Sequence, residues 1–522
     1  MTHRRLRELV WATDSRASLF SCAHGCWRPT LSCTPMNSNT RMTRRAVLRN
    51  LGVVTGAMLA FGASSPAATV AAPGRRAAKL PRSENTRKQI FRHVFKTPMV
   101  DTHEHLPDES QRLQRAGAGS PRCDDWALLL SHYLDSDLRT AGMSKVDLDR
   151  FLSPDVDPME KWSLLEPWWP AVKNTGYAQA VRISMRELYG VENLSAMTVA
   201  KVQTAYDRLR KPGFYQEILR DHANLHSCQV NCLTGTPFRE STMPTLLMQD
   251  LSIVGMFAGP AFRQYAAPAG IEVKSLADWH RVIKWWFEKY GKYAVAVKSQ
   301  NAYARNIDYA RVPAEQAEPG FNKLLANERV SVEERKLVED HLFWYAVDEA
   351  TAHHLPVKLH TGYYAGQNGM PLSRLLHNAG SAADLCRLSP NTQFVFMHIC
   401  YPHYEELLGL VKHYTNAHVD MCWSWIINPI AAKDYFKKHI VTAPANKLLP
   451  FGGDYIPVEP VLGHAVIARQ GMAQALSELV EEGWLTASDA IDLIEPVLNG
   501  NAHRIFQLEK KTELLSRAAW GT

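Results

Sequence analysis

The stretch VDTHEHLP, residues 100–107, holds two histidines one residue apart at the end of an apolar segment. On a β-strand, residues two apart point to the same side, so the imidazoles of His103 and His105 would converge. Two neutral imidazole nitrogens can bind a divalent metal such as zinc. A lone His-x-His pair is more often a pair of surface histidines, so the choice between the two interpretations depends on the rest of the chain.

Four more polar residues stand near the ends of short apolar runs farther along the chain. They are Lys298 in YAVAVKS, His360 in PVKLHTG, His398 in QFVFMHI and Asp454 in KLLPFGGD. A histidine at a strand end usually just satisfies a hydrogen bond, and Gly-Gly-Asp alone is a turn. Chance rarely aligns so many such residues with successive strand ends, so the pattern predicts a metal site.

The runs that carry these residues belong to a series of eight candidate strands. Helical patterns such as SLADWHRVIKWWFEKYG and SVEERKLVEDHLFWYAVDEAT separate most of them. Alternating strands and helices predict a parallel sheet, and eight units predict a (β/α)8 barrel of the TIM type, whose strand ends meet at one mouth. A doubly wound open sheet is the competing fold, but no Gly-x-Gly-x-x-Gly follows any run. The candidate strands are residues 97–103, 226–234, 251–257, 293–299, 356–362, 393–399, 417–423 and 447–454.

Residues 106–222, between the first and second candidate strands, are rich in aromatic residues and mostly helical in pattern. In a barrel this region is a large insertion after the first strand, on the face that carries active sites. It either caps the pocket and contributes to specificity, or forms a helical layer whose aromatic residues pack only among themselves.

The motifs VDTHEHL, VKLHTG, FMHICYP and PFGGDY together resemble the metal-dependent amidohydrolase superfamily. The most similar branch is the one near uronate isomerases and the amidohydrolase domains fused to some glutamine synthetases. AVAVKSQNAYAR and the segment from ALSELVEEGWL to NAHRIFQL fit that branch too, and the resemblance extends over about residues 90–508. The histidine pair followed by His, His and Asp in this order is fairly specific for the superfamily and says little about the substrate.

The resemblance implies roles for five of these residues. His103, His105 and Asp454 would be metal ligands, and His360 would be a ligand or a group that polarises the substrate. His398 would be a second ligand or an acid/base residue. Glu104, which should point away from the flanking histidines, is expected to have a structural role.

Lys298 has two interpretations within the same resemblance. In binuclear members a lysine at the fourth strand is carbamylated and bridges two metals. In the favoured branch the lysine remains a plain cation that holds a substrate carboxylate, with Tyr303 and Arg305 nearby. We expect the plain cation and one divalent metal, zinc or else manganese, and a second metal only with carbamylation. An ordinary exposed lysine at a strand end is the alternative without function.

These assignments predict a metal-dependent hydrolase, in which metal-activated water attacks a C–N or C–O bond of a small, carboxylated substrate. Asp454 can bind the metal and act as a general base, and His360 or His398 can stabilise an oxyanion. One alternative is a metal-dependent isomerase, C–C lyase or decarboxylase acting on a sugar acid or a related carboxylate. Another is a non-catalytic binding protein, which the retention of every expected ligand opposes.

The net charge of +7 comes entirely from residues 1–72, which hold nine arginines, no lysine and two acids. The remaining chain is neutral, which argues against nucleic acid as a partner because phosphate binding needs a concentrated basic face. Residues 42–74, with Arg44 and Arg45 before an apolar run and small residues, resemble a twin-arginine signal peptide. Residues 1–41 are expected to be disordered or to reflect a wrongly assigned start.

Recognition by the twin-arginine export machinery would place the protein in the periplasm or outside the cell. Such substrates usually fold before export, often with a cofactor bound, which suits a metalloprotein. The apolar run is too short to span a bilayer, so no stable membrane anchor is expected. The cysteines form no Cys-x-x-Cys pair and predict neither a zinc ribbon nor a disulfide framework. The expected partner is a small-molecule substrate, residues 509–522 are expected to be a C-terminal tail, and a homo-oligomer is left open.

Overall fold

The computed structural model describes residues 84–114, 122–233, 236–252, 262–366 and 369–521. The predicted signal peptide and the segment before it lie outside the described residues. No helix in these ranges is long and apolar enough to cross a membrane.

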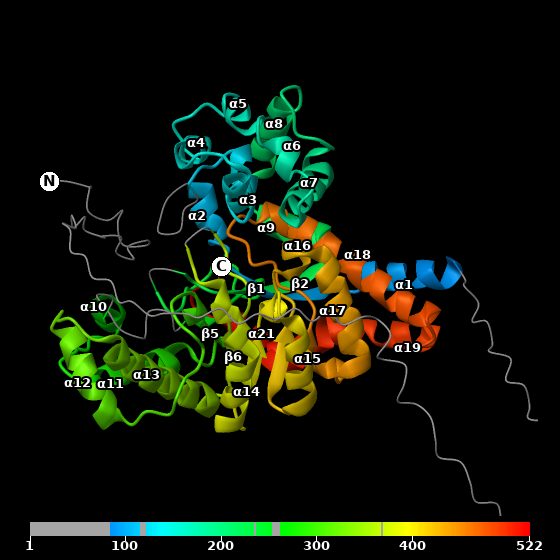
Figure 1. Cartoon of the computed structure of the whole chain (residues 1–522). Helices are drawn as coiled ribbons and strands as arrows, with labels where there is room; N and C mark the ends of the chain where they lie inside the picture. Colours follow the sequence, from blue (N-terminus) through cyan, green and yellow to red (C-terminus); the bar gives the residue numbers. More distant parts are fainter. Residues whose placement is uncertain (1–83, 115–121, 234–235, 253–261, 367–368, 522) are drawn as a thin grey trace, which may run out of the picture. The chain divides into compact units, whose positions relative to one another are not determined.

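The described residues contain short strands that pair in parallel throughout (Figure 1). One sheet has the order β1-β2-β3 and the other the order β4-β5-β6-β7-β8-β9. The strands are β1 (Met99–Glu104), β2 (Leu225–Val230), β3 (Leu247–Gln249), β4 (Leu251–Ser252), β5 (Val297–Ser299), β6 (Val357–Leu359), β7 (Phe394–Phe396), β8 (Ala417–Asp420) and β9 (Leu448–Leu449).

Backbone hydrogen bonds join the two sheets between β3 and β4, which only Asp250 separates. The N–H of Asp250 donates to the carbonyl of Val230 on β2 (2.9 Å), and the N–H of Val295 donates to the carbonyl of Gln249 (3.0 Å). Residues 247–252 therefore act as one strand of the barrel. We predicted this strand at 251–257, four residues too late, because the polar pair Gln249 and Asp250 interrupts the apolar run.

The segment after β9 closes the barrel onto β1. The N–H of Thr102 donates to the carbonyl of Phe451 (3.0 Å), and the N–H of Asp454 donates to the carbonyl of His103 (2.8 Å). With β3 and β4 counted as one strand, eight parallel strands of the described chain surround the core. The predicted (β/α)8 fold with a large helical insertion after the first strand is confirmed.

The helices that follow the strands cover the outside of the barrel (Figure 1). Two of them start as their sequences predicted: the Ser275 side chain caps α11, and Ser331 forms a capping box with Glu334 at the start of α13. These outer helices are α10 (Phe262–Ala266), α11 (Leu276–Tyr290), α12 (Ala314–Leu325), α13 (Val332–Ala352), α14 (Asn378–Leu388), α15 (Tyr404–His413), α16 (Ser424–Ile427), α17 (Pro429–Thr442) and α18 (Glu459–Glu481).

The chain between β1 and β2 is helical, and most of its helices gather at the top of Figure 1. Its α7 packs directly on α18 of the barrel, where the N–H of Gly463 donates to the Ser184 hydroxyl (2.9 Å). A Cβ at Gly463 would lie 1.9 Å from the carbonyl oxygen of Ala180, so this contact requires glycine. The helices are α2 (Glu109–Gln114), α3 (Leu134–Ala141), α4 (Lys145–Phe151), α5 (Lys161–Leu165), α6 (Trp169–Val172), α7 (Gly176–Tyr189), α8 (Val199–Leu209) and α9 (Phe214–Gln216).

Short helices complete the described chain. They are α1 (Glu84–Lys96), α19 (Ala487–Asp492), α20 (Asn501–Phe506), α21 (Leu508–Leu515), and the 3-10 or π segments η1 (Trp126–Leu130), η2 (Glu217–His222), η4 (Ala267–Ala269), η5 (Asn301–Tyr303), η6 (Leu372–His377), η7 (His398–Cys400), η8 (Ala445–Lys447) and η9 (Pro496–Gly500).

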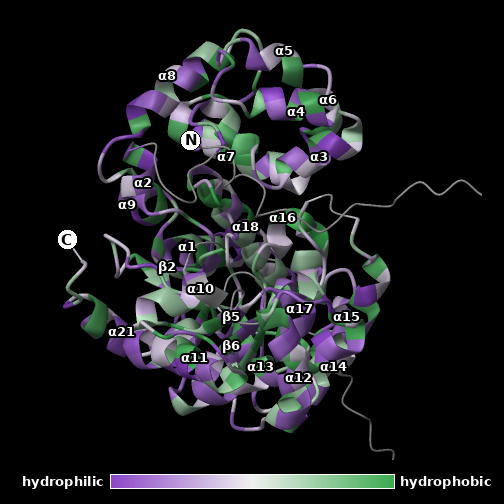
Figure 2. Ribbon diagram, turned by 90° about the vertical axis from the view of Figure 1, so that its left-hand side faces the viewer, coloured by the Kyte–Doolittle hydropathy of each residue, from purple (hydrophilic) through white to green (hydrophobic). Residues whose placement is uncertain are grey.

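The core lies between the strands and the outer helices. Every residue of β5 and β6 is buried, and Figure 2 shows hydrophobic ribbon around these two strands. The expected C-terminal tail belongs to this packed body: Leu515 of α21 is buried, and the Trp520 ring lies 4.7 Å from that of Tyr293.

Candidate metal centre

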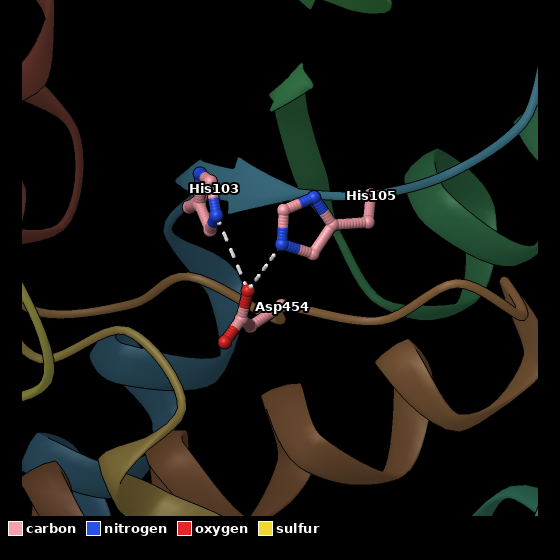
Figure 3. A group of neighbouring side chains, drawn as sticks. All are labelled: His103, His105 and Asp454. Atoms are coloured by element: carbon pink, nitrogen blue, oxygen red, sulfur yellow. Dashed lines mark ion pairs between the residues drawn. The ribbon is translucent and has the colours of Figure 1, made fainter. Parts of the chain in front are cut away.

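Three side chains from the two ends of the barrel chain converge at its mouth (Figure 3). The Nε2 atom of His103 lies 3.2 Å from Oδ1 of Asp454, and the Nε2 atom of His105 lies 3.1 Å from the same oxygen. His103 lies on β1, His105 comes directly after the end of β1, and Asp454 follows β9. Closure of the barrel therefore brings residues 350 positions apart within the reach of a single ion, as the strand-end pattern predicted.

The hydrogen bonds of His105 determine which of its two nitrogens carries the proton and which one presents a lone pair to the Asp454 carboxylate. Nδ1 lies 3.0 Å from the carbonyl oxygen of Asn231, which can only accept, so Nδ1 carries the proton. The amide nitrogen of Gln300 lies 3.1 Å from Nε2, whose single lone pair would turn from this contact to a bound cation. A lone pair facing a carboxylate oxygen at 3.1 Å is repulsive unless a cation lies between them. The donor set of two imidazoles and one carboxylate fits zinc or a similar divalent ion.

His103 is fully buried, and neither ring nitrogen makes a hydrogen bond within the described part of the chain. Burial, together with the nearby ammonium of Lys298, lowers the pKa of His103 to about 4. The ring is thus neutral at pH 7 and has a free lone pair. An orphaned polar ring in the core is costly, and metal coordination removes that cost.

A buried ion pair, Asp250 with Lys358, lies next to the His103 ring on the side of Nδ1. Asp250 Oδ2 lies 3.8 Å from Nδ1 of His103, and both of its oxygens accept from the Lys358 ammonium at 3.0 Å. Lys358 also donates to the carbonyl of Thr102 (2.7 Å), next to His103. A carboxylate behind a ligating imidazole orients the ring and makes it a better ligand. Sequence reasoning missed this pair, although a lysine inside the apolar strand VKL was its signal.

The loop that carries Asp454 is held in an unusual conformation. Asp454 has a φ of 63°, in the left-handed region that non-glycine residues seldom adopt. The carboxylate of Glu104 accepts from the N–H of Tyr455 (2.6 Å), and an ideal Cβ at Gly453 would lie 1.8 Å from Glu104 Oε1. Glu104 therefore presses against the backbone on both sides of Asp454, in agreement with the structural role expected for it.

A second group of donors lies next to the first. One ligand atom each of His398, Cys422 and Asp454 lies within 4.8 Å of the others, and all three residues are buried. Nδ1 of His398 lies 3.0 Å from the carbonyl oxygen of Cys422 and must donate to it, which leaves Nε2 with a lone pair. Cys422 was not among the predicted site residues. Its signal was its place in MCW, at the end of the seventh predicted strand, residues 417–423.

Comparison with known proteins matches residues 314–508, from α12 to α20, to the amidohydrolase family model. The resemblance inferred from the strand-end motifs is confirmed. A search of the curated proteins found no match.

Several solved structures share the fold. A uronate isomerase from Thermotoga maritima superposes with a TM-score of 0.65 at 13% identity, covering 81% of this chain and 98% of that one. A glucuronate isomerase from Caulobacter crescentus gives 0.65 at 17% identity, with 85% and 96% covered. A presumed metal-dependent hydrolase from Lactobacillus casei gives 0.54 at 15% identity, with 81% and 98% covered. These likenesses show that the chain shares its fold with these proteins.

His360 lies beside His398 but outside both donor groups of the barrel mouth. Their ring centroids are 4.4 Å apart, and the Tyr303 ring lies 4.5 Å from that of His360. Nε2 of His360 lies 2.9 Å from the carbonyl oxygen of Tyr363 and donates to it. Neutral His360 and His398 thus have no N–H left for an oxyanion, in contrast to our expectation, and offer lone pairs instead. Burial lowers the pKa of both rings, to about 3 for His398.

Lys298, on β5 of the barrel, is completely buried, and its ammonium has no hydrogen-bond partner among the described residues. This burial excludes the alternative in which Lys298 is an ordinary exposed lysine with no function. Burial lowers its pKa to about 8, although Asp454 favours its charged form. An ammonium buried without a partner among the described residues is suited to bind an anionic group.

The predicted helper Arg305 does not join this group. Its guanidinium pairs with Asp340 (2.5 Å) and Glu339 (3.3 Å) on α13, and it lies over the ring of Tyr309. Tyr303 does lie at the site, but its hydroxyl accepts from the N–H of Ala365 (3.0 Å). The carboxylates of α13 therefore hold the Arg305 side chain away from Lys298. Sequence reasoning did not find them because they are distant from Arg305 in the sequence.

The helical insertion contributes aromatic residues to the wall of the candidate metal site. The ring of Tyr133 is stacked against Trp423 at 4.8 Å and against Tyr177 at 5.3 Å, and Trp423 lies 5.5 Å from His398. The Tyr133 hydroxyl donates to the backbone carbonyl of Asp454 (2.5 Å). The insertion's aromatic residues therefore pack against the barrel mouth as well as among themselves, which fits a cap that shapes the pocket.

Proposed function

We propose that this amidohydrolase-like enzyme hydrolyses a C–N or C–O bond in a small, carboxylated substrate. The observation that carries the proposal is the convergence of His103 and His105 on Asp454 beside the unpaired ammonium of Lys298. A divalent ion held by these three ligands would act as a Lewis acid and lower the pKa of water.

The protein groups around the centre can perform the remaining steps. Asp454 contacts both imidazoles through Oδ1, so Oδ2 remains to accept a proton from the attacking water. His398 offers Nε2 as a second proton acceptor when no metal ion is bound to that nitrogen, because its Nδ1 proton is held by the carbonyl of Cys422. Lys298 is the donor suited to a negative group, either the substrate carboxylate or a developing oxyanion.

The capping aromatic residues would exclude water from the bound substrate. Tyr133, Tyr177 and Trp423 are each less than a tenth exposed. A site closed in this way strengthens the attraction between Lys298 and a carboxylate, because the local dielectric is low. It also limits the substrate to a small molecule.

A second candidate is isomerisation of a sugar acid. It is favoured by the barrels of the two isomerases that superpose on this chain and by the same buried ammonium, which suits a uronate carboxylate. Proton transfer between adjacent carbons needs the same acceptors, Asp454 or His398. The two candidates differ in whether water enters the product.

The test begins with metal analysis of the purified protein. The metal-loaded enzyme is then assayed in H2(18)O against carboxylated lactones, esters and amides and against uronates. Hydrolysis gives a product with one labelled oxygen from water in its new carboxyl group, and His103→Ala abolishes both activity and most of the bound metal. A product of unchanged elemental composition from a uronate supports the second candidate. Wild-type protein that binds no divalent metal would refute both.

We propose in addition that the enzyme acts after export by the twin-arginine machinery. The paired arginines and the apolar run of residues 42–74 support this proposal.

A further inference from the structure

The thiol of Cys422 occupies a position at the barrel mouth that the proposed reaction does not use. Cys422 follows β8, is 0% exposed, and has its backbone fixed on both sides. Its N–H donates to Asp420 Oδ1 (2.8 Å), and its carbonyl accepts from His398 Nδ1 (3.0 Å). The residue that positions the His398 ring is thus also the residue that carries the thiol.

The neighbouring strand end makes room for this side chain. An ideal Cβ at Gly452 would lie 2.9 Å from the Cys422 sulfur and 2.8 Å from its Cβ. Any larger residue at 452 would push the thiol away from the loop that holds Asp454. The absence of a side chain there lets sulfur, imidazole and carboxylate approach one another.

The donor atoms of His398, Cys422 and Asp454 lie within 4.8 Å of one another, which is close enough for one ion to bind all three. His398 presents the lone pair of Nε2, since its other nitrogen donates to a carbonyl. Asp454 can contribute Oδ2, because Oδ1 is the oxygen nearest to His103 and His105.

The chemistry of the three donors selects the ion. A thiolate with an imidazole and a carboxylate suits zinc, cobalt or cadmium, whereas magnesium, calcium and manganese prefer oxygen ligands. The ammonium of Lys298 lies nearby and opposes a further positive charge. This position should therefore bind its ion more weakly than the His103–His105–Asp454 centre does, and it should fill after that centre.

We infer that His398, Cys422 and Asp454 form a second, thiolate-containing metal position that takes a thiophilic divalent ion beside the first. The inference rests on the proposed metal centre only through the shared carboxylate of Asp454. When the ion binds, the Cys422 thiol gives its proton to solvent and a metal–sulfur bond forms, with no change of oxidation state.

The test is a titration of metal-free protein with cobalt(II). Binding is monitored through the thiolate-to-cobalt charge-transfer absorption in the near ultraviolet. Wild type should bind two equivalents, and the band should grow mainly with the second. Cys422→Ser should lose the band and the second equivalent but keep the first, which also reports that the variant is folded. Cys386→Ser, at a buried cysteine on α14, should behave as wild type.

His103→Ala separates the inference from the proposed function. This variant should bind the first equivalent at least tenfold more weakly and still develop the band. A zinc-loaded wild-type sample should show one sulfur scatterer at about 2.3 Å by X-ray absorption, a readout that needs no variant. Saturated wild type without a thiolate band and without that sulfur, or a band that survives Cys422→Ser, would overturn the inference.

Discussion

The residues at the barrel mouth are set by constraints that differ for each side chain. His103 and Asp454 are placed by backbone pairing, because the N–H of Asp454 donates to the carbonyl of His103 (2.8 Å). The pattern of polar residues at strand ends was sufficient to find them. Asp250 and Lys358 could not be paired from sequence, since their contact depends on the register of strands separated by 108 residues.

Replacement of Asp454 by Asn should separate the role of its charge from that of its shape. Asn also tolerates the left-handed region, so the φ of 63° costs the variant little. Without the carboxylate the site loses its general base, and kcat should fall by about two to four orders of magnitude. The bound metal should fall by less. Kinetics with metal analysis on one preparation checks both, and activity near wild type would remove Asp454 from the mechanism.

Replacement of Lys298 by Met should remove a substrate contact and leave the first metal position intact. KM for a carboxylated substrate should rise by about 10- to 100-fold, because a charge-assisted contact in a buried site is worth about 1.5–3 kcal/mol. An uncharged analogue lacking the carboxylate should be used as the control, and its KM should change little. A variant that loses the first metal equivalent would instead indicate a carbamylated, metal-bridging lysine.

At the scale of elements, positions were predictable where the hydrophobic period was uninterrupted. The apolar runs around β6, β7 and β8 stood out clearly, whereas Gln249 and Asp250 concealed the start of the third barrel strand. The contact of the insertion with the barrel was not predictable, because it depends on a close approach of two helices. The structure shows this approach at Gly463, which lies directly against the backbone of Ala180.

Substitution of Gly463 by Ala should therefore weaken the docking of α7 on α18. The new Cβ would lie 1.9 Å from the Ala180 carbonyl oxygen, so the helices must separate, which typically costs about 1–3 kcal/mol of unfolding free energy. Gly380→Ala on α14 is the matched control, since its Cβ would meet nothing within 4 Å. That substitution should stabilise the protein by about 0.4–1 kcal/mol. Urea unfolding measures both, and equal midpoints would show that the contact is not tight.

At the scale of the whole molecule, the barrel requires both ends of its sequence before the site exists. His103 stands at the start of the barrel and Asp454 near its end, so the metal ligands meet only when the last strand closes onto β1. Metal binding should therefore report complete folding, and folding should precede export by a pathway that carries folded proteins. Under the export proposal, the arginine pair at 44 and 45 determines where the finished metal site acts.

Substitution of both Arg44 and Arg45 by Lys should keep the protein in the cytoplasm without changing its fold. The charge is preserved, but lysine lacks the planar, five-donor guanidinium, so a receptor that reads arginine geometry should reject it. Fractionation of a host with an active twin-arginine pathway should find the wild type in the periplasm and the double variant inside the cell. Cytoplasmic variant protein should contain as much metal per chain as the wild type, because the barrel begins after these residues. Periplasmic recovery of the double variant would show that export does not depend on the arginine pair, and metal-free cytoplasmic variant would show that the site is filled only after export.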